Sequence, residues 1–358
     1  MPITISKQLI HKILTEFGLA QQISKIASAQ SGYRNTVIPM ILKNGQNLSL
    51  IFYKREPGIV KKIQRANYVS SELAKKDWPT RRAITNQNGQ SVIQLAVNHK
   101  IQYCCIYNYL PGHTISWSDY SQKHLKLLGQ VLGYLHHDLA TIKPFVKNSK
   151  FLETMVLREN LIEMNNYFCS KNIQVALKKK LNITLSSRRW QQWENLLIAL
   201  EKIRPIQFLH LDFVRGNILF EKLPSHSSLQ TPMVNKLNFD LDQTSKSTPS
   251  ITGILDWEKT ALGAPVIDVA RTLAFLIIDC RYKPENKVKK YFLNSGYEKR
   301  GQQTLRYKQL LDPLIEFFLC YDFYKFLKHN PYEFLPQNEH FIRTATWLKQ
   351  HQLLLPIQ

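Results

Sequence analysis

The sequence predicts an α+β protein with two lobes: a small N-terminal lobe built on an antiparallel sheet and a larger, mostly helical C-terminal lobe. Runs rich in strand-forming residues are concentrated before residue 108. After that point, apolar residues recur mostly at helical spacing. The 358 residues, 44% of them apolar, suffice for a large core of one or two lobes. We therefore expect an N-terminal lobe of residues 1–108 and a C-terminal lobe of residues 109–358.

The N-terminal lobe is expected to begin with a helix and a short turn. Apolar residues over 10–17 have helical spacing. Residues 31–38 (SGYRNTVI) follow as a glycine-containing turn between two strands. There Gly32 would permit close backbone approach to a ligand, and Asn35 would stabilise the turn.

The rest of this lobe combines two strands with a helix. Residues 48–54 (LSLIFYK) alternate and are rich in strand formers, so we expect a strand that ends at Lys54. Neighbouring strand residues point to opposite faces, and so either Lys54 or the adjacent Arg55 should aim inward. A helix is expected over 60–75 and a strand over 101–107.

The C-terminal lobe is predicted to be helical, apart from short strands around its loops. An apolar stripe runs through residues 124–137. Residues 150–203, 269–279 and 307–329 also have a helical character. The aromatic segment 317–326 within the last helix either packs in the core, which we favour, or lines a site for a quaternary amine.

Two short motifs carry the functional signal. Residues 210–217 (HLDFVRGN) place an Asp and an Asn five positions apart on a tight loop after an apolar run. Residues 254–258 (ILDWE) place another Asp at the end of a strand-like run. Phosphoryl transfer from ATP needs a carboxylate that accepts the proton of a hydroxyl, and an Asp and an Asn that bind Mg²⁺. We assign Asp212 as the base, and Asn217 and Asp256 as the magnesium ligands.

These residues resemble the aminoglycoside phosphotransferase and choline kinase family, a branch of the protein-kinase-like fold. That family has H-G-D-x-x-x-x-N followed by I-D-W-E, and here Leu211 stands at the glycine position. Residues 263–270 (GAPVIDVA) are similar to its G-D-P-x-x-D-L-A, with Ala264 in place of the common Asp. The resemblance implies a bilobal protein-kinase-like fold, with ATP and Mg²⁺ as cofactors. It also implies that Asp268 is a buried carboxylate that braces the catalytic loop.

The resemblance assigns nucleotide contacts to the N-terminal lobe. Gly32 and Asn35 fall in the short loop that covers the phosphates. Lys54 takes the place of the strand lysine that holds the α- and β-phosphates. Asn108 and Tyr109 fall at the hinge, where backbone groups would hydrogen-bond the adenine edge.

One residue of the family pattern is missing. Family members carry a Glu that pairs with the strand lysine on the helix after it. The corresponding position falls near Ala66, with Asn67 beside it. Glu56 and Glu72 are the nearest alternatives, and neither fits well. The partner of Lys54 therefore stays open.

Three further residues of the two motifs receive supporting roles. His210 would anchor the catalytic turn through its ring nitrogens. Arg215 either reaches the γ-phosphate or braces a loop carbonyl, and both readings stay open. Glu258 would assist the second magnesium indirectly. Residues 222–250 are polar and turn-rich, so we expect a long surface excursion where the family has a short hairpin.

The net charge of +22, from 48 Lys and Arg against 26 Asp and Glu, admits several interpretations. It fits a kinase that handles ATP and an acidic substrate, a protein that binds nucleic acid, or a solvated basic surface. Because the charge is spread along the chain, we regard nucleic acid as the weaker alternative. A polycationic aminoglycoside needs clustered carboxylates, so a sugar, an amino alcohol or a phosphorylated metabolite is at least as plausible an acceptor.

The sequence thus predicts a small-molecule kinase that transfers the γ-phosphoryl group of ATP to a hydroxyl. The alternatives are a kinase-fold binding or regulatory protein with little turnover, and a kinase that acts on a protein or RNA. No apolar run approaches the roughly 18 residues of a spanning helix, and the N-terminus lacks an apolar signal core. We therefore expect a cytoplasmic protein without a membrane partner. The five cysteines are expected to be reduced, buried thiols.

Overall fold

The chain folds into two compact units. A computed structural model describes residues 5–31, 35–97, 100–144, 152–185, 189–221, 249–299 and 305–356. The first unit comprises residues 1–114 and 217–260, and the second comprises residues 115–216 and 261–358. The sequence-based division at residue 108 differs from these units mainly in residues 217–221 and 249–260, which pack with the first unit.

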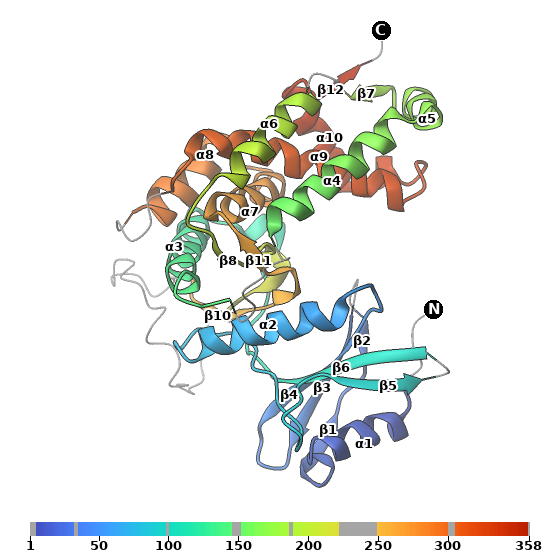
Figure 1. Cartoon of the computed structure of the whole chain (residues 1–358), viewed down its shortest axis with the longest axis vertical. Helices are drawn as coiled ribbons and strands as arrows, with labels where there is room; N and C mark the ends of the chain where they lie inside the picture. Colours follow the sequence, from blue (N-terminus) through green and yellow to red (C-terminus); the bar gives the residue numbers. More distant parts are fainter. Residues whose placement is uncertain are drawn as a thin grey trace. The chain divides into compact units, whose positions relative to one another are not determined.

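The first unit is built on a six-stranded antiparallel sheet in the order β1-β3-β4-β6-β5, with β2 paired to β3 (Figure 1). Its strands are β1 (Ile23–Ile26), β2 (Gln30–Ser31), β3 (Thr36–Leu42), β4 (Asn47–Tyr53), β5 (Ile93–Val97) and β6 (Lys100–Asn108). β4 lies in the middle of the sheet, and every residue after its first is buried. The predicted strands over 48–54 and 101–107 are confirmed, except that β4 ends at Tyr53, one residue before Lys54.

Two helices cover opposite faces of this sheet (Figure 1). Helix α1 (Lys7–Glu16) packs on one face together with Leu50 and Phe52 of β4. Helix α2 (Ile59–Ala74) packs on the other face together with Ile51 and Tyr53. Even-numbered residues of β4 therefore face α1, and Ile51 and Tyr53 face α2. This alternation decides which side chains can meet the helix that follows the strand.

A hairpin from later in the sequence completes the first unit. Strand β9 (Ile218–Phe220) pairs with β10 (Ile251–Ile254), and a 3₁₀ turn over Trp257–Lys259 packs against α2. Thr80, which follows α2, bridges to Ile254. The predicted excursion over 222–250 lies outside the described residues, except at its last two positions.

The second unit is mainly helical. Its helices are α3 (Gln122–Leu139), α4 (Glu153–Cys169), α5 (Lys171–Leu181), α6 (Arg189–Glu201), α7 (Pro265–Asp279), α8 (Glu285–Lys289), the π-helical η6 (Lys290–Tyr297), α9 (Leu311–His329) and α10 (Glu339–Gln350). Two small strand pairs join them: β8 (Gln207–Leu209) with β11 (Ala261–Gly263), and β7 (Ile183–Leu185) with β12 (Leu354–Pro356). Apolar α7 packs against α9, which also contacts α4, α6 and α10. The predicted α+β class is confirmed.

The aromatic segment of α9 belongs to the core. Phe317, Phe318 and Phe323 are buried. The ring of Phe317 meets Trp193 edge-on at 5.8 Å between centroids, and Phe323 stacks on Phe341 at 5.1 Å. These contacts favour core packing over a quaternary-amine site.

Helix α3 and η6 approach each other closely at glycines. A Cβ atom at Gly129 would lie 2.0 Å from the carbonyl oxygen of Phe292, and one at Gly296 would lie 2.7 Å from that of Lys126. Both distances are shorter than real Cβ contacts. The two backbones can therefore meet only where side chains are absent.

This contact gives a stability prediction. We expect Gly129→Ala to lower the free energy of unfolding by about 2 kcal/mol, because the added methyl group forces rigid backbones apart. Gly216→Ala is the control, since a Cβ there meets nothing within 4 Å. Thermal unfolding of the two variants measures the difference. Equal stability of both would contradict the close packing.

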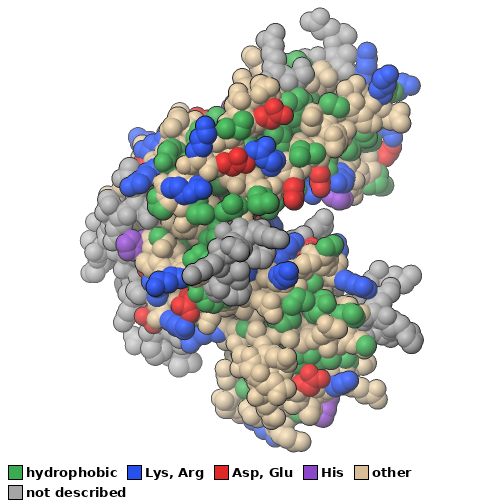
Figure 2. All heavy atoms as spheres, in the orientation of Figure 1, with side chains coloured by type: hydrophobic (Ala, Val, Ile, Leu, Met, Phe, Trp, Pro, Cys, Tyr) green, Lys and Arg blue, Asp and Glu red, His purple; other side chains and the backbone are tan. Residues whose placement is uncertain are grey.

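Charge and thiols are distributed over the surface and core. Lys and Arg side chains are scattered among acidic and apolar ones on the face seen in Figure 2.

Cys104, Cys105, Cys280 and Cys320 are buried free thiols. The expectation of buried thiols is wrong for Cys169, the last residue of α4, which is exposed. Among the helices that the structure describes, none has the length and apolarity needed to cross a membrane.

Candidate active site

The predicted catalytic loop leaves β8 in the second unit and is held by one buried carboxylate. Asp268, in the first turn of α7, is fully buried. It accepts the backbone N–H groups of His210 at 2.7 Å and Leu211 at 2.9 Å. The ring of His136 on α3 lies 3.1 Å from the same carboxylate through Nε2. Asp268 therefore connects the loop to two helices.

The ionisation of Asp268 follows from these contacts. Burial alone raises the pKa of its carboxyl, but the hydrogen bond and charge of His136, together with His210, lower it more. The net result is a pKa below the ordinary value, so Asp268 is a carboxylate in the folded protein. His136 also meets the hydroxyl of Tyr297 through Nδ1 at 2.7 Å, which joins η6 to the same group of contacts.

The loop contains a strained residue at the family's glycine position. Leu211 has φ +61°, in the left-handed region that glycine adopts without strain, and its side chain is buried. Next to it, the Nδ1 atom of His210 accepts the backbone N–H of Asp212 at 3.1 Å. Asp212 is only 6% exposed. The loop backbone is thus fixed on both sides of the predicted base.

Arg215 lies further along this loop and braces a carbonyl. Its Nη1 donates to the carbonyl oxygen of Ile115 at 3.2 Å. Its Nε lies 3.9 Å from the carboxylate of Asp279, and its guanidinium lies 5.3 Å from the ring centroid of Trp117. Of the two roles left open for Arg215, the structure supports the brace.

The first unit brings the two predicted metal ligands to one end of the β9–β10 hairpin. Asn217 immediately precedes Ile218, which pairs with Ile254, and Asp256 follows two residues after Ile254. The backbone N–H of Leu255 donates to the carbonyl oxygen of Asn217 at 2.8 Å. Asp256 itself has φ +60°, so the backbone turns sharply at this residue.

Glu258 forms an acidic pair with Asp256. Burial, then the hydrogen bond with Asp256 and its negative charge, raise the pKa of Glu258 well above its ordinary value, while the charge of Arg81 opposes this. The Glu258 atom Oε2 is shut off from solvent and has no hydrogen-bond partner. A divalent cation beside this pair would balance its negative charge.

The donor set of this hairpin fits magnesium. Carboxylate and amide oxygens are hard ligands, and Mg²⁺ is usually held by one or two protein carboxylates together with phosphates and water. Within the part of the chain that the structure describes, no group of three or more His, Cys, Asp or Glu could hold a metal.

A neutral hydrogen-bond chain links the sheet to α2 where the resemblance implies a lysine–glutamate pair. The hydroxyl of Tyr53 lies 2.6 Å from that of Tyr107, which donates to Oδ1 of Asn67 at 2.9 Å. Burial raises the pKa of both tyrosines well above the ordinary range, so they are neutral. Asn67 thus links α2 to the sheet by a hydrogen bond, and its partner is a tyrosine.

The residues predicted to contact phosphate, Lys54 and Asn35, are not part of this chain of hydrogen bonds. Lys54 and Arg55 are exposed after the end of β4. The backbone N–H of Lys54 donates to Oδ1 of Asn35 at 3.1 Å, which ties the start of β3 to the end of β4. Gly32 lies outside the described residues.

The two acids considered as partners of Lys54 form other ion pairs. Glu56 pairs with Lys62 at 2.7 Å. Glu72 pairs with Lys75, the residue that follows α2.

Arg81 is a cation of the first unit that the motifs do not reveal. It follows the bridge between Thr80 and Ile254, lies 5.9 Å from the ring centroid of Tyr107, and acts electrostatically on Glu258. Only the fold brings it to the acidic pair. It is a second candidate for contact with phosphate.

The predicted hinge residues have their backbone N–H groups engaged. Asn108 donates its N–H to the carbonyl oxygen of Arg82 at 3.1 Å, and its side chain accepts the N–H of Arg82. The N–H of Tyr109 donates to Asn47 at 3.1 Å. A contact from these two residues to adenine would therefore use their carbonyl oxygens.

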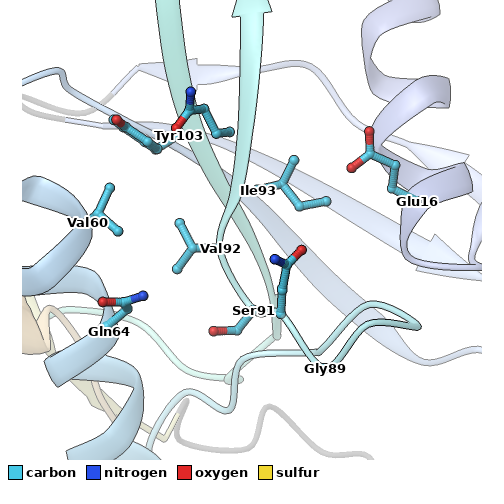
Figure 3. Close-up of a pocket in the computed structure, with 10 residues that line it drawn as sticks. Glu16, Val60, Gln64, Gly89, Ser91, Val92, Ile93 and Tyr103 are labelled. Atoms are coloured by element: carbon cyan, nitrogen blue, oxygen red, sulfur yellow. The ribbon is translucent and has the colours of Figure 1, made fainter.

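A pocket of about 560 Å³ opens at the β5 edge of the first unit (Figure 3). It is lined by Val60 and Gln64 of α2, residues 89–94, Tyr103 and Glu16. None of the predicted site residues that the structure describes is in this lining. The pocket is thus separate from the motif residues.

The sheet with helices on both faces, the helical second unit and the braced loop define a protein-kinase-like fold. Solved structures bear this out. An amicoumacin kinase in complex with AMP-PNP, Ca²⁺ and Ami superimposes with a TM-score of 0.65 at 12% identity, over 98% of this chain and 95% of that chain. An aminoglycoside phosphotransferase from Alicyclobacillus acidocaldarius gives 0.57 at 11%, over 98% and 94%. An ethanolamine kinase from Plasmodium vivax gives 0.52 at 14%, over 97% and 89%.

The likeness is one of fold, because the sequences have diverged far. No protein-family model matches the chain, and no curated protein matches its sequence. The resemblance predicted from the two motifs is confirmed at the level of the fold.

Proposed function

We propose that the chain is an ATP-dependent phosphotransferase that moves the γ-phosphoryl group to a hydroxyl of a small molecule. The braced loop is the observation that carries this proposal. The backbone N–H groups of His210 and Leu211 are held by the buried Asp268, and that of Asp212 is held by the ring of His210. Similar solved structures include kinases that act on small molecules, one of them bound to AMP-PNP and Ca²⁺.

In the proposed reaction, Asp212 orients the acceptor hydroxyl and takes its proton late in the transfer. Asn217 and Asp256 would hold Mg²⁺, with Glu258 beside them. Bound Mg²⁺ would neutralise phosphate charge. The chain itself contributes mainly positioning and electrostatic stabilisation.

The nucleotide contacts are part of the same proposal. Lys54 would hold the α- and β-phosphates, Gly32 and Asn35 would cover them, and Asn108 and Tyr109 would border the adenine. A cytoplasmic location completes the proposal.

The test is ADP release from magnesium-ATP in the presence of hydroxyl compounds: aminoglycosides, macrolides, amino sugars, choline, ethanolamine, homoserine and thiamine. Turnover with one compound that is lost in Asp212→Asn supports the proposal and names the acceptor class.

A second candidate is a kinase-fold protein that binds nucleotide with little turnover. The neutral chain of Tyr53, Tyr107 and Asn67 favours it, because active protein kinases use a charged lysine–glutamate pair at this point. Magnesium-dependent ATP binding without ADP release from any acceptor would support this candidate.

Removing the phosphate-binding cation should weaken ATP use. We expect Lys54→Ala to raise KM for ATP about tenfold or more, because a hydrogen bond to a charged group contributes roughly 1.5–3 kcal/mol. Steady-state kinetics of Lys54→Ala and Arg81→Ala measures this, with the exposed Lys43→Ala as control. An increase in Arg81→Ala alone would show that the phosphates are held by Arg81 and not by Lys54.

A further inference from the structure

We infer that the pocket at the β5 edge of the first unit binds an uncharged, hydroxyl-rich small molecule, a sugar or polyol, at a site separate from the proposed kinase site. The pocket has a volume of about 560 Å³, and α1, α2, β5, β6 and the loop before β5 all contribute to its lining. Small-molecule sites usually have roughly 300–1,000 Å³. The inference does not depend on phosphoryl transfer.

The loop before β5 forms one wall of the pocket, and hydrogen bonds hold it in place. It closes a turn in which Oδ1 of Asn86 accepts the backbone N–H groups of Asn88 at 3.0 Å and Gln90 at 2.8 Å. In the next residue, Oγ of Ser91 accepts Nδ2 of Asn67 on α2 at 3.1 Å. The wall is therefore attached both to itself and to α2 before a ligand arrives. Such preorganisation lowers the entropic cost of binding.

One side of the pocket offers an apolar surface. Val60 on α2, Val92 and Tyr103 on β6 are partly buried and pack against the apolar cluster between α2 and the sheet. Figure 3 shows Val60 on its helix opposite Val92, with Tyr103 beside them. A sugar ring has an apolar face of C–H groups, which this surface can cover.

The rest of the lining supplies polar groups that both donate and accept. Gln64, Gln90 and Gln94 are exposed and line the pocket, and Gln94 lies opposite Tyr103 in the register of β5 and β6. Each amide has two donor hydrogens and an acceptor oxygen. The hydroxyl of Ser91, which accepts from Asn67, can donate its hydrogen to a ligand. Because a ligand hydroxyl also donates and accepts, this mixture suits a hydroxyl-rich molecule.

The charge of the lining excludes the commonest anionic metabolites. Among the lining residues that the structure describes, none is Lys, Arg or His, although the chain has a net charge of +22. Phosphate and carboxylate groups are bound mainly by such cations. Glu16 at the end of α1 would repel an anion and can accept a ligand hydroxyl. Because Glu16 is exposed, its attraction for a cation is weak. These properties favour an uncharged ligand.

A ligand in this pocket would touch both α2 and the edge of the sheet. Val60 and Gln64 come from α2, and Gln94 comes from β5. Its contacts would add to the hydrogen bond by which Ser91 already joins Asn67. Binding should therefore stabilise the first unit, because a ligand that binds only the folded state raises the unfolding temperature.

The test measures binding of neutral compounds to the full chain without ATP. D-glucose, D-galactose, maltose, myo-inositol and glycerol are titrated by calorimetry, and thermal unfolding is followed in parallel. Glucose 6-phosphate, galactose 6-phosphate, maltose 1-phosphate, inositol 1-phosphate and glycerol 3-phosphate are the charged counterparts. We expect at least one neutral compound to bind and to raise the unfolding temperature. Its phosphorylated counterpart should bind about tenfold or more weakly, because a buried phosphate needs opposite charge.

Variants of the lining assign the binding to this pocket. Gln64→Ala and Gln94→Ala should each weaken binding by roughly two- to tenfold, the effect of losing one hydrogen bond. Both side chains are exposed, so the variants should keep the fold, which thermal unfolding without ligand checks. Gln8→Ala is the matched control, since Gln8 is an exposed glutamine near the start of α1, whereas Glu16 is the last residue of that helix.

Three results would overturn the inference: no binding by any neutral compound, tighter binding of a phosphorylated counterpart, or binding that both glutamine variants leave unchanged. Asp212→Asn should bind the compound like the wild type. Loss of binding in Asp212→Asn, with binding kept in Gln64→Ala, would place the compound at the proposed kinase site and would also overturn it. ADP release is measured separately, so the proposed function and this inference can fail independently.

Discussion

Asp212→Asn is expected to lower kcat for phosphoryl transfer by about 10²- to 10⁴-fold, the usual contribution of a general base. The amide has nearly the shape of the carboxylate but cannot take the proton of the hydroxyl. The contacts of the loop with His210 and Asp268 go through the backbone, so the variant should keep its fold. ADP release and ATP binding, measured together, check this.

The control for this variant is Asp312→Asn, whose side chain is 71% exposed on α9. It should retain full activity. If Asp212→Asn kept more than about a tenth of the wild-type kcat, Asp212 would not be the base.

Asp268→Asn is expected to lower the free energy of unfolding by about 1–3 kcal/mol at neutral pH, the usual cost of leaving a buried hydrogen-bond donor without its acceptor. The amide nitrogen of Asn cannot accept the N–H groups of His210 and Leu211 as both carboxylate oxygens do. Urea unfolding of the variant and the wild type measures the loss.

This loss should depend on pH in a defined direction. The folded pKa of Asp268 is lowered below its unfolded value, which is about 3.9. Its stabilisation is therefore fully present above the unfolded pKa and disappears as pH falls through the folded pKa. The gap between wild type and variant should shrink below about pH 4. A gap that stayed constant down to pH 3 would falsify this account.

Long periodic segments made most of the fold predictable. Helix α2 and strand β4 were expected within one residue of their ends because each has a strong apolar pattern. The strands β7 and β12 have only three residues each and pair across most of the second unit, so no local pattern announces them. Helix α10 also escaped prediction.

The candidate site also contains residues that a local motif indicates and residues that only the fold brings together. The candidate base Asp212 and the first candidate metal ligand Asn217 could be proposed from sequence because they stand five residues apart in one motif, and their roles stay predictions. Lys54 was predicted as the last residue of the strand that became β4. That strand ends one residue earlier, at Tyr53, which faces α2. Arg215 and Arg343 both lie over the ring of Trp117, and only tertiary structure brings such distant positions together.

The link between α2 and the sheet has a consequence for solution conditions. Salt weakens an exposed lysine–glutamate pair, because ions screen charges over about 10 Å at 0.1 M. Tyr53, Tyr107 and Asn67 carry no charge, and burial keeps both phenols protonated. This hydrogen-bonded link between α2 and the sheet therefore contains no ion pair that salt could screen. The apolar packing of Ile59 and Ile63 against the same face of the sheet adds to it.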